Sequence, residues 1–147
     1  MSVAATLRRA RRDSRGSVAV EFAILAPAVF TMMFGVFQVG LGLQNYNALR
    51  NVSAEVARYA MVQYATGNKL TDTQLSSYAN ALGTSGTYLL KSENLNATVA
   101  TAATQRVTGV TEKTLTLSYR IPSLLASLGL NGPQLTYSRP LFVCITC

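Results

Sequence analysis

The pattern of apolar and polar positions begins with one long apolar run. Residues 22–43 read FAILAPAVFTMMFGVFQVGLGL, and only Thr31 and Gln38 are polar among these 22 positions. No charged residue occurs between Glu21 and Arg50. A helix needs about 20 apolar residues to cross a bilayer, so this run is long enough for a membrane span.

The helical pattern continues beyond the apolar run. Uncharged positions recur at a spacing of three and then four residues, which is typical of an amphipathic helix with one buried face. These positions are Leu49, Val52, Val56, Tyr59 and Gln63, with Ala48, Ala57 and Ala60 nearby. The sequence Thr66-Gly67-Asn68 is a stop signal. A helix over residues 18–65 is about 70 Å long at about 1.5 Å per residue. Its second half must therefore pack on its own domain or on a neighbouring copy.

The rest of the chain predicts a second, shorter helix and a small sheet. Thr71, followed three residues later by Gln74, forms a capping-box pattern that starts a helix over about 71–82. Residues 113–121 read KTLTLSYRI, in which Leu115, Leu117, Tyr119 and Ile121 share one face. Such alternation indicates a half-buried strand.

Two further segments complete the expected sheet. Residues 95–103 are rich in Thr, Ala and Val, and residues 134–144 read as a last strand. Pro140 limits that last strand to an edge or a bulge, because proline cannot donate to a ladder. Residues 123–128 suggest a helical turn. The fold class is therefore α+β: a long N-terminal helix, a second short helix and an antiparallel sheet of about three strands.

Composition places apolar surface in a membrane or an assembly. The 147 residues are 49% hydrophobic and 13% charged, whereas soluble domains carry about 25% charged residues. The net charge is +7. More than half of it comes from residues 1–16, which hold one acid, Asp13, and the arginines Arg8, Arg9, Arg11, Arg12 and Arg15.

The basic tail predicts topology. Positive residues on the N-terminal side of a span favour a cytoplasmic N terminus, with everything after residue 45 outside. A basic tail is also compatible with nucleic-acid binding. This one has no interleaved aromatic residues, so we expect no nucleic-acid partner and a contact with membrane lipid.

The residue types for catalysis and metal binding are sparse. The chain has no histidine and two cysteines, which argues against a His-based catalytic site or a zinc site. The four acids beyond Glu21 show no paired spacing and read as solvated surface charges; they are Glu55, Asp72, Glu93 and Glu112. We expect no enzymatic activity, no catalytic residue, no metal and no cofactor.

The two cysteines form a C-x-x-C at the chain end, Cys144 and Cys147. Outside the membrane an oxidised pair is favoured over free thiols. The Cα atoms of a disulfide are about 4.4–6.8 Å apart, so the last four residues would have to turn. Pairing between subunits remains an alternative.

The N terminus could be a cleaved secretory signal or an uncleaved signal anchor, and both interpretations have a weakness. A secretory signal would use Ala26-Pro27-Ala28 as its cleavage site. Only four apolar residues separate that site from Glu21, where about 7–15 are expected. An uncleaved signal anchor leaves Glu21 unexplained, because a carboxylate next to a span is costly to bury.

The third interpretation is a resemblance. Residues 15–22 read RGSVAVEF after a basic leader, and Pro27 and a Phe34-Gly35 pair follow. This segment resembles the TadE-like pseudopilins of the Tad (Flp) pilus, in the type IV prepilin class. The resemblance implies cleavage after Gly16 by a prepilin peptidase. Ser17 then becomes the first residue of the mature chain, Glu21 its fifth, and Phe22 begins the apolar helix.

The resemblance also implies an organisation and a set of partners. Residues 1–16 form the leader, 17–45 a transmembrane and assembly helix, and 46–147 an extracytoplasmic pilin-like domain. Expected partners are the prepilin peptidase, the major Flp-type pilin, a sister pseudopilin and the inner-membrane assembly platform. The implied role is that of a minor pilin in pilus biogenesis and adherence. The alternatives are an uncleaved single-pass protein with a periplasmic binding module and a secreted soluble domain.

The role of Glu21 can be argued from spacing. Cleavage after Gly16 leaves an α-amine on Ser17, and residues 17 and 21 are neighbours one turn apart on a helix. A carboxylate in the first turn also interacts favourably with the helix dipole. In an assembly Glu21 can instead pair with the Ser17 amine of an adjacent subunit. One unpaired charge in an apolar setting is expensive, so such pairing fixes the register between subunits.

Overall fold

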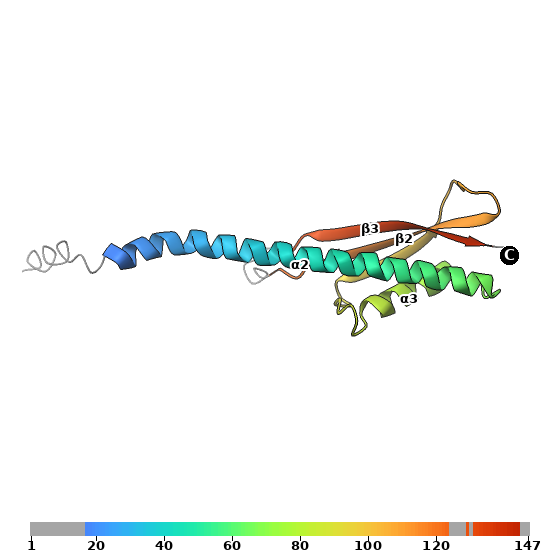
Figure 1. Ribbon diagram of the computed structural model, residues 1–147, viewed down its shortest axis with the longest axis horizontal. Helices are drawn as coiled ribbons and strands as arrows, with labels where there is room; N and C mark the ends of the chain where they lie inside the picture. The colour runs from blue at the N-terminus through green and yellow to red at the C-terminus, as the bar shows by residue number, and fades with distance from the viewer. Residues whose placement is uncertain (1–16, 124–128, 130, 145–147) are drawn as a thin grey trace, which may run out of the picture. The chain divides into compact units, whose positions relative to one another are not determined.

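The computed structural model describes residues 17–123, 129 and 131–144 (Figure 1). The elements follow in the order α2 (Ser17–Ala65), α3 (Asp72–Gly83), β1 (Leu95–Thr101), β2 (Val110–Arg120) and β3 (Gln134–Cys144). The predicted α+β class is confirmed. Most of the helical turn expected at 123–128 lies outside the described residues. The chain divides into two compact units between Val39 and Gly40, and α2 contributes residues to both.

The end of α2 is set by Gly67. This residue has φ +83, a conformation that glycine adopts without steric cost. The Asn68 N–H donates to the Gln63 carbonyl at 2.9 Å, and the Gly67 N–H donates to the Tyr64 carbonyl at 3.1 Å. Together these bonds form a Schellman motif, which satisfies two otherwise unpaired helix carbonyls. The stop predicted at residues 66–68 is confirmed.

The start of α3 is set by a capping box. The Thr71 hydroxyl accepts from the Gln74 N–H at 3.2 Å, and the Gln74 side chain accepts from the Thr71 N–H at 2.9 Å. Both backbone donors are otherwise unsatisfied at a helix start, so the pair fixes where α3 begins. The predicted capping residues are confirmed.

The sheet has the order β1-β2-β3, and both neighbouring pairs are antiparallel. Leu117 in the central strand lies opposite Ala97 of β1 and Tyr137 of β3. Pro140 lies opposite Thr114 on the edge strand β3. An edge position tolerates proline because its missing N–H can face away from the ladder, and the predicted edge placement is confirmed.

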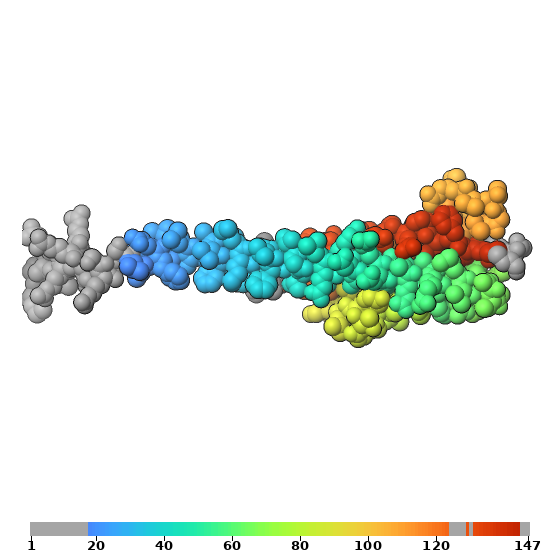
Figure 2. All heavy atoms as spheres, viewed as in Figure 1, coloured from blue at the N-terminus to red at the C-terminus, as the bar shows by residue number. Residues whose placement is uncertain are grey.

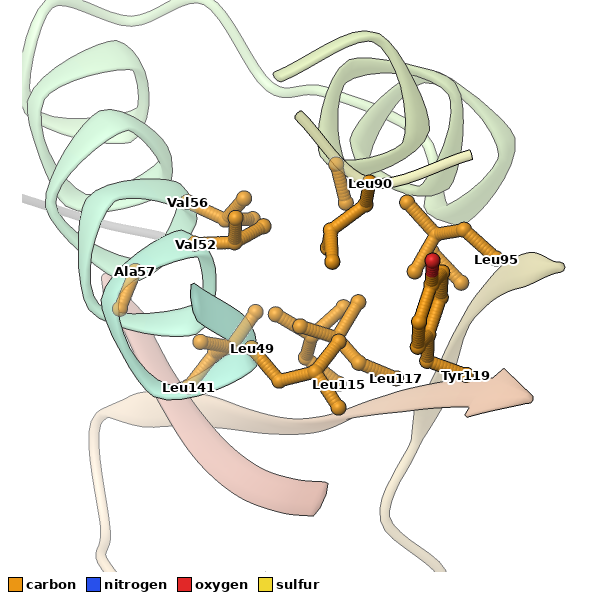
Figure 3. Close-up of a cluster of buried hydrophobic side chains, with 12 residues drawn as sticks. Leu49, Val52, Val56, Ala57, Leu90, Leu95, Leu115, Leu117, Tyr119 and Leu141 are labelled. Carbon is orange, nitrogen blue, oxygen red and sulfur yellow. The ribbon is translucent and has the colours of Figure 1, made fainter. Parts of the chain in front are cut away.

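The hydrophobic core lies between the second half of α2, α3 and one face of the sheet (Figure 3). Leu49, Val52 and Val56 of α2 are fully buried, as are Leu115 and Leu117 of β2. The alternation predicted for residues 115–121 is confirmed, since Tyr119 and Ile121 are also buried. The second half of α2 therefore packs on its own domain.

Part of the predicted helix face is wrong. Tyr59 and Gln63 are only half-buried. The buried seam continues through Ala60, as predicted, and then through Tyr64, which was not predicted. Four-residue steps from Val56 keep this seam on the sheet, because a helix turns once in 3.6 residues. Tyr59 lies beside the seam and stacks on Tyr78 of α3, with ring centroids 4.0 Å apart.

Candidate functional site

The predicted processing and assembly residues lie at the beginning of α2. Gly16 lies outside the described residues, and Ser17 is the first residue of the helix. Glu21 and Phe22 follow one turn later, and the Phe22 side chain is 67% exposed. Glu21 is the fifth residue, so the first turn contains no acid. A favourable interaction of this carboxylate with the helix dipole stays a prediction.

The part of α2 that follows Glu21 presents its apolar side chains outward. The helix is long and apolar enough to cross a membrane by length and composition. Thr31, one of its two polar residues, donates its hydroxyl to the Pro27 carbonyl at 2.7 Å. A hydroxyl satisfied inside its own helix costs less in lipid. The exposed large side chains of this segment include Ile24, Leu25, Val29, Phe30, Met32, Val36, Phe37, Val39 and Leu43.

The run of apolar residues ends inside the folded unit. A Cβ at Gly42 would lie 3.3 Å from the Cδ1 atom of Ile121, which directly follows β2. Four residues later Tyr46 meets Tyr137 of β3 edge to face, with ring centroids 5.8 Å apart. In the space-filling view β3 lies directly against this part of α2 (Figure 2). The small residue and the aromatic pair therefore join the helix to the sheet.

The structure buries one acid that the sequence analysis placed in solvent. The Glu112 side chain is 5% exposed and accepts two hydrogen bonds at 2.9 Å from Nε of Arg106. The Arg106 guanidinium also lies over the Phe142 ring, 5.6 Å from its centroid. The expectation of a solvated Glu112 is wrong, because the loop between β1 and β2 folds back over it. No periodic sequence signal links residues 106 and 112.

The hydrogen bonds from Arg106 hold the pKa of Glu112 below its ordinary value, although burial acts in the opposite direction. A second ion pair joins Lys113 of β2 to Asp72 of α3. Lys113 is itself nearly buried. These two pairs tie the β1–β2 loop and α3 to the sheet, and they are structural contacts.

Tyrosines gather where α2 faces α3. The Tyr88 hydroxyl donates to Oε2 of Glu55 at 3.1 Å. Burial, followed by the nearby Glu55 carboxylate, raises the pKa of Tyr78. Burial raises the pKa of Tyr88 as well, with its hydrogen bond to Glu55 as the next cause. Both hydroxyls therefore stay protonated at neutral pH, as expected for packing residues rather than acid–base groups.

The remaining predicted residues are the two cysteines. Cys144, at the end of β3, is disulfide-bonded. Cys147 lies outside the described residues, so its pairing with Cys144 stays a prediction. Within the described part of the chain no three His, Cys, Asp or Glu side chains gather in a group suited to a metal ion.

Comparison with known families gives one match. Residues 16–58 match the family described as TadE-like protein. The resemblance predicted from the sequence is confirmed for this segment, which is similar to TadE-like proteins. Neither the curated proteins nor the solved structures contain a match to the chain.

The Arg106–Glu112 pair predicts an acid-sensitive contribution to stability. A carboxyl whose pKa is lower in the folded state stabilises the fold above its unfolded pKa of about 4.3. That contribution is lost as the pH falls through the lower, folded-state pKa. We expect the urea midpoint of the intact protein to fall more steeply between about pH 6 and about pH 3 than that of Arg106→Gln.

Arg58→Gln is the matched control, because Arg58 is exposed and has no part in this pair. Its midpoint should follow the wild-type pH profile. Parallel profiles for the wild type and Arg106→Gln would contradict the assigned role of the ion pair.

Proposed function

We propose, starting from the TadE-like segment at residues 16–58, that the chain is a minor pilin of a Tad (Flp) pilus system. In this proposal a prepilin peptidase removes the leader after Gly16. The mature protein is anchored in the inner membrane by the apolar part of α2, with residues 46–147 on the periplasmic side. It then takes part in building or priming an adhesive pilus.

The main support for this proposal is that the family match and helix α2 cover largely the same residues. The TadE-like match contains Gly16, Glu21, the whole apolar run and the beginning of the buried helix face at Leu49. The structure forms all of its described residues into one helix, α2. A single helix with an apolar exposed start and a packed second half suits a subunit that is held first by lipid and then by other helices.

Glu21 is the residue to which we assign the assembly contact. It stands immediately before 28 uncharged residues, 22–49. Such a carboxylate is stabilised in an apolar environment only when a positive group pairs with it. The α-amine that cleavage creates on Ser17 supplies that group, from the same chain or from an adjacent subunit. Pairing between subunits would set their axial register.

The partners follow from the same argument. The peptidase acts on the leader, the major Flp-type pilin and a sister pseudopilin provide the adjacent helices, and the assembly platform receives the subunit from the membrane. The alternative function is an uncleaved single-pass protein with a periplasmic binding module. Both interpretations use the apolar helix, and only cleavage separates them.

The first test is the N terminus of the mature protein. We expect purified protein from host membranes to begin at Ser17, and to begin at Met1 or Ser2 when the prepilin peptidase is absent. The bulky variant Gly16→Val should remain uncleaved. Its control, Ala10→Val, changes the same leader by the same residue type and should be cleaved normally. Intact mass and N-terminal sequencing give the result.

An N terminus at Met1 or Ser2 both with and without the peptidase would contradict the pilin proposal and support the uncleaved anchor. A start at Val29 would instead indicate a secreted domain.

The second test concerns Glu21. With its carboxylate removed, Glu21→Ala should still be cleaved and inserted, because the apolar run is unchanged. Its recovery in complexes with the other pilins should fall about tenfold or more, since breaking a buried charge pair costs several kcal/mol. Glu93→Ala is the control, because Glu93 is exposed and pairs only loosely with Lys91, at 3.9 Å. Co-purification equal to that of Glu93→Ala would refute the register role.

A further inference from the structure

The end of the apolar run belongs to the same compact unit as the sheet. Residues 40–43 are the last four positions of the run, and they lie in the unit that spans Gly40–Cys147. Leu41 and Gly42 are half-buried, with Ile121 against Gly42. The folded domain therefore begins before the apolar run has ended, with no polar linker between them.

The base of the β2–β3 hairpin is fixed at this place. Ile121 is 3% exposed, and its N–H donates to the Pro133 carbonyl at 3.0 Å. A Cβ at Gly132 would lie 1.9 Å from the Ile121 carbonyl oxygen, so the returning chain passes as close as backbone permits. The contacts of Ile121 with the returning chain and with Gly42 thus fix one end of the sheet beside α2.

Two tyrosines flank this end of the domain. Tyr46 follows Leu43 by three residues, about 4.5 Å along the helix axis. Its ring is 37% exposed and meets the half-buried Tyr137 ring edge to face. Tyrosine has an apolar ring and a polar hydroxyl, and it is enriched where membranes meet water. A bilayer that ended near Leu43 would therefore present its headgroups close to these two rings.

The surrounding charges suit phosphate headgroups. Arg50 and Arg120 are exposed, and Arg120 directly precedes Ile121. No acid occurs between residues 22 and 54 or after Glu112. The loop before β1 contributes one acid, Glu93, which has Lys91 beside it at 3.9 Å. Positive side chains just outside an apolar surface attract the phosphates of a lipid layer.

We propose that the outer domain docks directly on the bilayer surface through this end, with Tyr46 and Tyr137 in the headgroup layer. Tyr137 lies 94 residues after Leu43 in the chain, yet it contacts lipid because Tyr46 holds it there. The inference rests on the membrane span of the proposed function. It adds that the domain lies on the membrane instead of standing away from it.

The chain contains no tryptophan, so single tryptophans can report depth. Full-length Tyr46→Trp and Tyr137→Trp are reconstituted in phosphatidylcholine vesicles with brominated acyl chains, which quench nearby tryptophan. Phe34→Trp, inside the apolar run, reports insertion of the span. Phe142→Trp is the distant control, because it lies eight residues along β3 from Gln134, about 27 Å at about 3.4 Å per residue.

We expect strong quenching of Phe34→Trp, quenching of Tyr46→Trp and Tyr137→Trp to about half that extent, and none of Phe142→Trp.

If Tyr137→Trp behaves like Phe142→Trp while Phe34→Trp is quenched, the docking is refuted and the span stands. A Tyr137→Trp shielded from both bromolipid and aqueous acrylamide would place a second protein copy on this end, and would also overturn the proposal. An unquenched Phe34→Trp would refute the span and the docking together, whereas cleavage at Gly16 is measured separately.

Discussion

The structure depends on the packing of one helix face against one strand. Leu49, Val52 and Val56 of α2 lie against Leu115 and Leu117 of β2, and all five side chains are fully buried. Burial of such side chains contributes about 1.5–3 kcal/mol each relative to exposure. Without this contact, the apolar face of the sheet would lose its cover, and a sheet must bury such a face against another element.

The same helix serves two environments. Its first part exposes large apolar side chains that water disfavours, and its second part buries a narrow apolar seam against the sheet. No change in backbone conformation separates the two parts, since α2 runs from Ser17 to Ala65. The sequence changes instead: residues 22–43 are apolar on every face, and the residues after them are apolar on one. The first part of such a helix can be surrounded by lipid or by other helices while the core stays intact.

Local rules in the sequence predicted the elements well. The capping pair Thr71 and Gln74, the stop at Gly67 and the alternation around Leu117 each depend on residues within one turn or one strand. Glu112 could not be predicted in the same way. Its burial depends on how the β1–β2 loop returns, which brings Arg106 and Phe142 together with no periodic spacing. Tyr59 was misplaced for a related reason, because its partner Tyr78 comes from another helix.

The residues of the candidate functional site were easier to recognise in the sequence than in the structure. The spacing from Gly16 to Glu21 and the uncharged run were visible in the residues themselves, and the TadE-like match covers both. The junction at Gly42 was not, because the contact with Ile121 joins positions 79 residues apart. That junction links the two properties of the helix, membrane affinity and domain packing.

Amide hydrogen exchange of the full chain in lipid nanodiscs tests this central claim most directly. The segment to follow is the polar stretch at residues 44–47, between the apolar run and the buried seam. If one helix passes unbroken from lipid into the domain core, these amides exchange as slowly as those of residues 52–60. Fast exchange at 44–47, with protected amides on both sides, would show a hinge there and contradict the account.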